Sequence, residues 1–320
     1  MLRADSLAGR IITAFARTSP VFRPTGDRKP GRSWWRAWTR TTPAFAPSWP
    51  PMWPGALMFG VDLTRADLSE ASLAYVNLTR ANLTRANLGG ADLINAGLTH
   101  VNLTDANLVD ADLASANLTR ADLTEANLTR ANLTRANLTG AELTRANLTE
   151  AQLPSANLDE AYATGANLTG ADLTRATLFC ANLDDAVLTS ATLFGADLTD
   201  ATLMGATLIN AGLIGANLTG ADSAGANLTR ADLTEADLTR ADLTRANLTD
   251  ANLTRANLTE ADLTRADLYR TNFVGVVWSE GTLWPTGEWE ARLRAASEQL
   301  PDGRLRVRAE DASDSVSIHA

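Results

Sequence analysis

Apolar residues recur along most of this chain with a period of five. Alanine occupies the first position of almost every five-residue unit and leucine the third, as in ANLTRANLTR at residues 126–135. The phase is unbroken from Val61 to Gly275, which gives 43 consecutive units. A period of five leaves no face of a 3.6-residue helix consistently apolar, so the pattern argues against long helices.

Each unit predicts a very short strand followed by a corner. Alanine and leucine are two residues apart, so in an extended backbone both point to one face, and the Asn or Asp between them points to the other. The fourth and fifth residues are polar or end in glycine, as at Gly140 and Gly170, which is typical of turns. Such a short strand needs copies of itself above and below, so the pattern predicts a parallel solenoid with leucine along its axis.

Three residues depart from this pattern in ways that affect the prediction. Ala163 and Ser223 stand where leucine is expected. Each is expected to leave a void, either as neutral drift in a very stable solenoid or as a local bend that fits a partner. Pro154 occupies a turn position and is expected to interrupt one backbone hydrogen bond.

The motif A-(D/N)-L-x-x, present here as ANLTR, ADLTE and ADLTD, resembles that of the pentapeptide-repeat proteins. The resemblance covers about two thirds of the chain. It implies an all-β fold, a right-handed quadrilateral parallel β-helix with four units in each coil, which puts Ala163 and Ser223 on the same side. On that basis the 43 units form about 10 to 11 coils, and at ~4.8 Å per coil the rod is roughly 50 Å long.

Residues 1–55 are rich in Arg, Pro and Trp and show no periodicity. A basic and aromatic segment is compatible with membrane or nucleic-acid binding. The interpretation adopted for this segment is a disordered leader, or an upstream extension of a chain that starts at Met52 or Met58. Nothing functional is assigned to it.

The repeats are predicted to occupy residues 56–283, because Leu283 is still in the leucine phase. Trp289, Leu293, Ala296 and Leu300 then predict an amphipathic helix that ends before Pro301, within a cap of residues 284–303. In the tail, residues 304–320, the alternating RLRVR is compatible with an edge strand. The exposed end of a solenoid needs a cover. Five residues are assigned to that cap, or to a dimer contact of the kind that related proteins place at this end: Trp278, Trp284, Trp289, Leu293 and Leu300.

The chain shows no constellation typical of catalysis or cofactor binding. His100 is at a turn position, His319 is in the tail, and Cys180 is a turn residue. None has a candidate nucleophile or metal partner nearby in the sequence. The prediction is a non-enzymatic protein with no cofactor and no metal.

Cysteine usage and hydropathy favour a cytoplasmic location. One cysteine excludes an internal disulfide framework and fits a reducing compartment. No apolar run reaches the ~18 residues of a membrane helix. The short IITAFA stretch, with Arg10 and Arg17 on either side, is too weak for a secretory signal.

Charge is distributed unevenly along the repeats. The whole chain has a net charge of −9, and residues 61–275 carry 14 Arg against 27 Asp and Glu, a net charge of −13. Residues 156–225 hold eight acidic residues against Arg175 alone, a net charge of −7. The flanking repeats, 61–155 and 226–275, have net charges of only −4 and −2. The middle third is therefore the strongly acidic part.

This middle third is interpreted as a contact surface. With four units to a coil, Asp159, Glu160, Asp197 and Asp200 share one face, and Asp184 and Asp185 lie around one corner. Apolar residues replace the usual Thr here, and Phe194 and Ile214, one coil apart, are expected to stack. The candidate partner-binding residues are Asp159, Glu160, Asp172, Asp184, Asp185, Asp197, Asp200, Asp222, Phe194 and Ile214; Phe179, Met204 and Ile209 lie in the same zone.

Two functions and a simpler alternative follow. The first is a scaffold that presents residues 156–225 to a protein partner. The second comes from the resemblance, since some pentapeptide-repeat proteins mimic duplex DNA, bind DNA gyrase and protect against quinolones. Seven net negative charges over roughly 17 Å approach the roughly ten phosphates of duplex DNA of that length, whereas the Arg-rich ends do not. In neither case is the repeat domain expected to bind nucleic acid. The simpler alternative is that the acidic balance only keeps the rod soluble.

Overall fold

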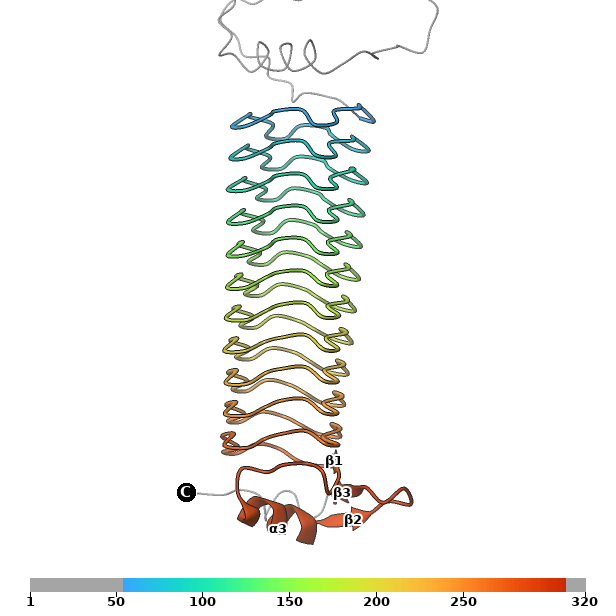
Figure 1. Ribbon diagram of the computed structural model, residues 1–320, viewed down its shortest axis with the longest axis vertical. Helices are drawn as coiled ribbons and strands as arrows, with labels where there is room; N and C mark the ends of the chain where they lie inside the picture. Colours follow the sequence, from blue (N-terminus) through green and yellow to red (C-terminus); the bar gives the residue numbers. More distant parts are fainter. Residues whose placement is uncertain (1–53, 309–320) are drawn as a thin grey trace, which may run out of the picture.

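The computed structural model describes residues 54–308. The second residue of each unit forms a parallel bridge with the second residue four units later, as Leu57 does with Asn77 and Asn257 with Val277. Four five-residue sides therefore make one coil, and the chain is a β-helix solenoid (Figure 1). Most of the predicted leader, residues 1–53, and residues 309–320 of the predicted tail lie outside the described residues.

Backbone hydrogen bonds join each coil to its neighbours in a repeating set. The N–H groups of the second, third and fifth residues donate to carbonyls of adjacent coils, as Leu63 does to Asn82 at 2.7 Å. The N–H of the first residue donates to the preceding leucine carbonyl across the corner, as Ala66 does to Leu63 at 2.9 Å. In this repeating set, only the N–H of the fourth residue has no backbone acceptor.

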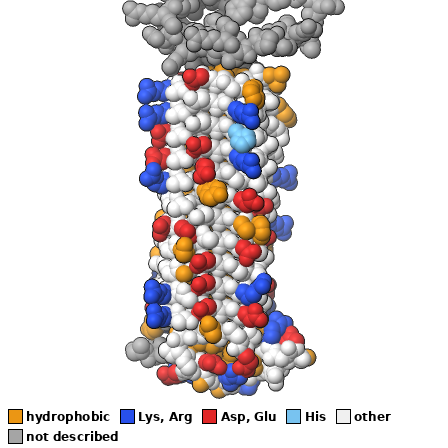
Figure 2. All heavy atoms as spheres, in the orientation of Figure 1, with side chains coloured by type: hydrophobic (Ala, Val, Ile, Leu, Met, Phe, Trp, Pro, Cys, Tyr) orange, Lys and Arg blue, Asp and Glu red, His pale blue; other side chains and the backbone are white. Residues whose placement is uncertain are grey.

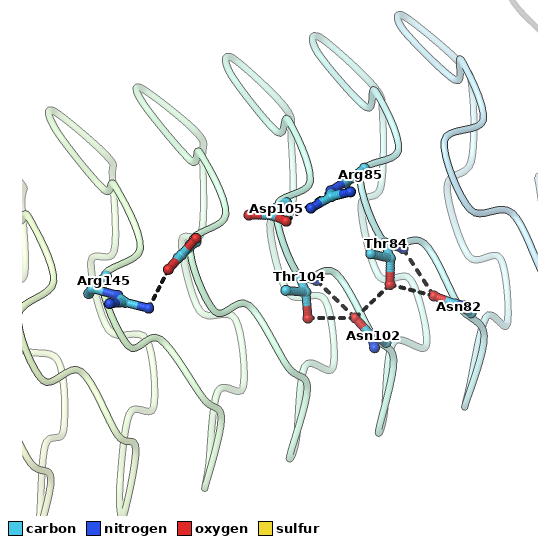
Figure 3. A network of polar contacts seen from close by, with 8 residues as sticks. Asn82, Thr84, Arg85, Asn102, Thr104, Asp105 and Arg145 are labelled. Atoms are coloured by element: carbon cyan, nitrogen blue, oxygen red, sulfur yellow. Dashed lines mark hydrogen bonds and ion pairs between the residues drawn. The ribbon is translucent and has the colours of Figure 1, made fainter.

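The side chain of the second residue supplies that acceptor. Oδ1 of Asn132 accepts both the N–H (3.1 Å) and the hydroxyl (2.6 Å) of Thr134. The same contacts join Asn82 to Thr84 and Asn102 to Thr104 in Figure 3. This local turn explains why Asn or Asp is followed two residues later by Thr in so many units.

Alanine and leucine form the core, as the sequence predicts. Ala121 and Leu123, for example, are each 0% exposed. One continuous cluster of buried apolar residues runs from Met58 to Val307. The fifth residue of each unit has a left-handed backbone, with φ of 56° at Arg130, which glycine adopts without steric cost. Glycine is therefore frequent at this position, and the hydrogen-bond ladder holds the other residue types there.

The prediction for Pro154 is wrong. Its carbonyl accepts the N–H of Arg135 at 3.0 Å, and the next N–H, of Ser155, donates to Thr174 at 2.9 Å. Pro154 is the fourth residue of its unit, and the fourth N–H has no backbone partner in the repeating set. Proline therefore removes no bond from the ladder.

Ala163 and Ser223 are buried in the axis, each 2% exposed. Their N–H groups donate to Asn182 at 2.7 Å and to Asp242 at 2.8 Å, as leucine does at this position in other units. The hydrogen-bond ladder is therefore continuous at both residues, and the stack of coils continues past them (Figure 1).

We expect Ala163→Leu to raise the free energy of unfolding by about 2 kcal/mol, because burying a leucine side chain contributes roughly that amount. Leu143 and Leu183 already occupy the same axial position one coil away on either side. Urea denaturation measures the change. The matched variant Ala161→Leu, at the first position of the same unit, is expected to lower stability by about 1–3 kcal/mol through overpacking. A loss of stability in Ala163→Leu would show that neighbouring side chains already fill the axis there.

The C-terminal region adds a small sheet and one helix to the last coil. Strands β1 (Val277–Trp278), β2 (Ser297–Gln299) and β3 (Leu305–Val307) form an antiparallel sheet in the order β1-β3-β2, and helix α3 (Gly287–Ala295) precedes β2. Val277 pairs both with Asn257 of the preceding coil and with Arg306 of β3. The RLRVR segment, expected at an edge, is therefore the central strand.

The helix is shorter than the sequence predicts. Helix α3 ends at Ala295, and Ser297 pairs with Val307 in the sheet. Leu300 follows β2 and does not lie on the helix. The spacing of apolar residues is helical up to Ala296, but pairing with β3, a contact distant in sequence, takes the residues that follow.

The repeat register ends before Leu283, contrary to the prediction. Leu283 pairs with Asp262, one position later than the regular spacing of the bridges, and its side chain is 52% exposed. Thr282 and Trp284 are turned inward instead, at 4% and 7% exposure. One additional residue at the corner before Thr282 moves the leucine out of the axis.

No helix within residues 54–308 has the length and apolarity needed to cross a membrane.

Candidate protein-binding surface

The coils of residues 156–225 have four sides, and the bridges between coils show which units share a side. The first side holds units 156–160, 176–180, 196–200 and 216–220; the second 161–165, 181–185, 201–205 and 221–225; the third 166–170, 186–190 and 206–210; the fourth 171–175, 191–195 and 211–215. This assignment shows on which side of the rod each candidate residue lies.

The ten candidate residues lie on three of these sides. The first side carries Asp159, Glu160, Asp197 and Asp200; the second Asp184, Asp185 and Asp222; the fourth Asp172, Phe194 and Ile214. The third side has no charged residue in this zone. A flat partner therefore cannot touch all ten residues at once, and the first and second sides, which share an edge, hold most of the negative charge.

Exposed apolar side chains accompany these carboxylates. Phe194 and Ile214 lie in adjacent coils of the fourth side and are 45% and 37% exposed. Phe179 on the first side and Met204 on the second are 43% and 44% exposed. The sequence reasoning missed Tyr162, which is 51% exposed on the second side; an aromatic residue at the outward second position is the signal that could have found it.

Two of the carboxylates also support the backbone. Asp159 Oδ1 accepts the N–H of Phe179 at 3.1 Å, and Asp184 Oδ1 accepts the N–H of Met204 at 2.9 Å. Both N–H groups are fourth-position donors in units whose second residue is Thr rather than Asn or Asp. The carboxylate of the preceding coil thus replaces the missing local acceptor. The two residues of each contact are 20 positions apart, so the sequence alone does not reveal this role.

The middle third, residues 156–225, differs from the rest of the rod in its ion pairs. Outside it, several fifth-position Arg residues pair with a carboxylate one coil away, as Arg85 does with Asp105 at 3.0 Å (Figure 3). The other pairs are Arg130–Asp110, Arg145–Glu125, Arg230–Asp250, Arg255–Glu235 and Arg270–Asp250. Within the described part of the chain, no acidic residue of 156–225 belongs to such a pair. Its negative charge is therefore uncompensated.

Cys180 lies one coil from both Glu160 and Asp200 along one edge. Desolvation raises the pKa of its thiol, and the carboxylates of Asp200, Glu160 and Asp159 raise that pKa further. The thiol is therefore mostly protonated at neutral pH and is a poor nucleophile. Residues 54–308 contain no group of three or more His, Cys, Asp or Glu side chains that could hold a metal ion. His100 is an exposed corner residue, and His319 lies outside the described residues.

The aromatic residues assigned to the C-terminal end pack within this chain. Trp278 is 0% exposed, and its ring meets that of Trp284 edge-on at 5.6 Å. Trp278 Nε1 donates to Ser297 Oγ at 3.0 Å. Trp289 packs against Phe273 with ring centroids 5.9 Å apart. Phe273 replaces the repeat leucine, and the sequence reasoning did not assign it to the cap.

Helix α3 contacts the same aromatic group. Leu293 is 0% exposed, whereas Leu300 is only partly buried. The Arg294 guanidinium lies over the Trp278 ring at 5.5 Å and donates to both carboxylate oxygens of Glu280 at 2.6 Å. These hydrogen bonds hold the pKa of Glu280 below its usual value. The buried members of this group are not available to a second chain.

These features define a class of protein: a β-helix built from five-residue repeats, with an outer surface that varies while the core does not. The sequence profile of pentapeptide repeats matches the chain in eight copies. The matched residues are 62–99, 95–135, 141–178, 156–193, 181–220, 213–250 and 241–277. The chain therefore belongs to the pentapeptide-repeat family.

Several solved structures are similar to this chain. HetL, a pentapeptide repeat protein involved in heterocyst differentiation regulation in the cyanobacterium Nostoc, is 36% identical, with coverage of 72% of this chain and 92% of HetL and a TM-score of 0.25. QnrB1, a plasmid-mediated fluoroquinolone resistance protein, is 16% identical, with coverage of 68% and 92% and a TM-score of 0.38. A pentapeptide repeat protein of the Arabidopsis thaliana thylakoid lumen is 24% identical, with coverage of 47% and 88% and a TM-score of 0.20. No curated protein matches the chain.

Proposed function

We propose that this protein is a non-enzymatic binding scaffold that presents residues 156–225 to a protein partner. The observation that carries the proposal is the contrast in charge compensation. Ion pairs occur along the edges of the other repeats. Residues 156–225 instead hold eight carboxylates and one Arg, and none of these carboxylates forms an ion pair. Exposed Phe179, Phe194, Met204 and Ile214 lie among them. Apolar groups beside uncompensated charge are typical of a contact surface.

The proposal includes finer features of the rod and its setting. We take the β-helix to be right-handed, with about 10 to 11 coils from 43 units at four per coil. The regular repeats end before Leu283, and we assign residues 284–303 to the cap. The protein is placed in the cytoplasm, needs no cofactor, and uses Trp278 and its aromatic neighbours to close the C-terminal end of the axis.

We expect loss of partner binding when the first-side carboxylates are neutralised by Asp159→Asn, Glu160→Gln, Asp197→Asn and Asp200→Asn. The amide oxygens keep the hydrogen bonds that Asp159 and Asp197 accept, so the fold is retained while four charges are lost. A pulldown with the full chain, followed by titration of the captured protein, measures the effect; at least tenfold weaker binding is expected.

The matched control neutralises carboxylates that already face an Arg: Asp105→Asn, Asp110→Asn, Glu125→Gln and Glu235→Gln. This variant loses the same formal charge elsewhere and is expected to bind the captured partner as the unchanged chain does. Equal binding by the first-side variant and the unchanged chain would contradict the proposal.

The second candidate function is binding to DNA gyrase in place of DNA. Its support is the negative charge of residues 156–225 together with the fluoroquinolone resistance function of the similar protein QnrB1. Because a duplex is charged all around, the neutral third side limits the similarity to the edge between the first and second sides. A gyrase supercoiling assay with and without ciprofloxacin, at two salt concentrations, tests it. Salt-sensitive inhibition or drug protection supports this function, and no effect at tens of micromolar excludes it.

A further inference from the structure

One edge of the rod contains a segment, from residue 60 to residue 220, whose charges reverse sign about Gly140. This segment, here called the 60–220 edge, consists of the fifth residues of the nine first-side units from residues 56–60 to residues 216–220; beyond it the same edge of the rod continues with Arg240 and Glu260. In order, the residues of the 60–220 edge are Gly60, Arg80, His100, Arg120, Gly140, Glu160, Cys180, Asp200 and Gly220. The sign changes at Gly140, and each Arg before it has an acidic counterpart at the same distance after it. Figure 2 shows this order along one edge, from blue and pale blue to red, followed further down by one more blue and one more red side chain.

Within one chain, the charges of the 60–220 edge form no ion pair with one another. On other edges, opposite charges one coil apart form pairs, as Arg130 does with Asp110 at 2.7 Å. Here the closest opposite charges, Arg120 and Glu160, are two coils apart, about 10 Å at the usual strand spacing, with Gly140 between them. In the described part of the chain, the ion pairs include none of Arg80, Arg120, Glu160 or Asp200, and all four side chains are exposed.

We propose that the 60–220 edge binds the same edge of a second copy of this chain, with the two rods antiparallel. A two-fold axis at Gly140 brings Arg80 opposite Asp200 and Arg120 opposite Glu160, each pair occurring twice. It also brings His100 opposite Cys180 and Gly60 opposite Gly220, while Arg240 and Glu260 of each rod lie beyond the first described coil of the other. A two-fold interface needs a self-complementary patch, and a column of charges that reverses sign about its centre has that property.

The side chains around the centre of the edge allow close approach. Gly140 itself has no side chain, and the first side next to it carries the short polar residues Asn117, Thr119, Asn137 and Thr139. From Arg80 to Asp200 the edge spans six coils, about 29 Å. Such a strip is narrower than the interfaces of stable dimers. The association is therefore weak, dominated by charge and sensitive to salt.

This inference rests on the proposed function, because Glu160 and Asp200 belong to the candidate partner-binding surface. It names a second copy of the chain as one occupant of that surface. A different protein that binds the first side would compete with self-association, so dimer and complex would be alternative states of the same edge.

Sedimentation equilibrium of the full chain tests the inference. At ~20 mM salt and high protein concentration the mass is expected to approach twice the 34.0 kDa of the chain, and at ~500 mM salt to return to that of one chain. The dissociation constant is expected to rise at least tenfold between the two conditions. A single-chain mass at low salt, at concentrations up to hundreds of micromolar, would overturn the proposal.

Charge reversal gives a sharper test. The variant with Arg80→Glu and Arg120→Glu has an acidic edge throughout, and the variant with Glu160→Arg and Asp200→Arg has a basic one. Each alone is expected to lose self-association, and an equimolar mixture is expected to regain it. Arg and Glu already occupy the fifth position elsewhere, as at Arg130 and Glu125, with the same left-handed backbone, so both variants keep the local conformation.

The matched control is Arg245→Glu with Arg265→Glu, which makes the same change in net charge on a different edge and is expected to leave the dimer intact. Failure of the mixture to associate overturns the antiparallel arrangement. If every variant is a single chain but the first-side amide variant still loses its captured partner, the self-association inference is wrong and the proposed function stands. If the dimer behaves as expected and no other protein is captured, the self-association inference is supported and the proposed binding of a different protein is not.

Discussion

Replacing Trp278 by alanine is expected to lower the free energy of unfolding of the C-terminal region by about 3–5 kcal/mol, the usual cost of removing a buried tryptophan side chain. Trp278 is 0% exposed, meets Trp284 at 5.6 Å and donates to Ser297 Oγ. Its loss leaves a cavity between the last coil and the β1-β3-β2 sheet. Tryptophan fluorescence during urea unfolding measures the overall change.

The effect is expected to be local. A solenoid is stabilised mainly by contacts between neighbouring coils, so amide hydrogen exchange should accelerate from about residue 256 to residue 307 and stay unchanged before residue 200. Tyr269→Ala, at a side chain that is 40% exposed, is the control and is expected to have little effect. Uniformly faster exchange along the whole rod after Trp278→Ala would show that the coils unfold as one cooperative unit instead.

Leu118→Ala is expected to destabilise the interior of the rod by about 2–5 kcal/mol. Leu118 is 0% exposed, and its N–H donates to Asn137 of the next coil at 2.7 Å. Leu98 and Leu138 stack on it from either side, so neither can fill the space without leaving its own position. The midpoint of urea unfolding and amide exchange over residues 96–140 report the change.

The control for this variant is Arg135→Ala in a neighbouring coil. Arg135 is exposed, and such surface substitutions usually change stability by no more than about 0.5 kcal/mol. If Leu118→Ala were equally mild, the axis would tolerate cavities, and Ala163 and Ser223 would then need no structural explanation. A large effect shows instead that these two residues occupy costly positions in an otherwise uniform core.

The local architecture could be predicted well because the same five-residue pattern of apolar and polar positions recurs along the chain. Alternation along an extended backbone places Ala121 and Leu123 on one face, and 43 repetitions of the same five positions remove the ambiguity of a single short strand. The end of the repeats was harder. One additional residue before Thr282 shifts Leu283 outward, and strand pairing between Ser297 and Val307 shortens helix α3. Both effects depend on contacts distant in sequence, which periodicity does not contain.

The candidate surface was only partly accessible to sequence reasoning. The excess of carboxylates in residues 156–225 is a matter of composition and could be counted. The hydrogen bond from Phe179 to Asp159 and the ion pair between Arg85 and Asp105 each join neighbouring coils. The sequence pattern alone does not say how many units make a coil; that grouping came with the family resemblance, and the bridges of the structure establish it.

The sequence by itself determined which side chains form the core and which face outward, because strand alternation is a local property of the backbone. It also determined the charge of each segment. Tertiary structure alone decided which outward residues are neighbours, since that depends on how many units close one coil. It therefore decided that Arg85 and Arg130 meet carboxylates one coil away, while the 60–220 edge keeps its opposite charges apart on either side of Gly140.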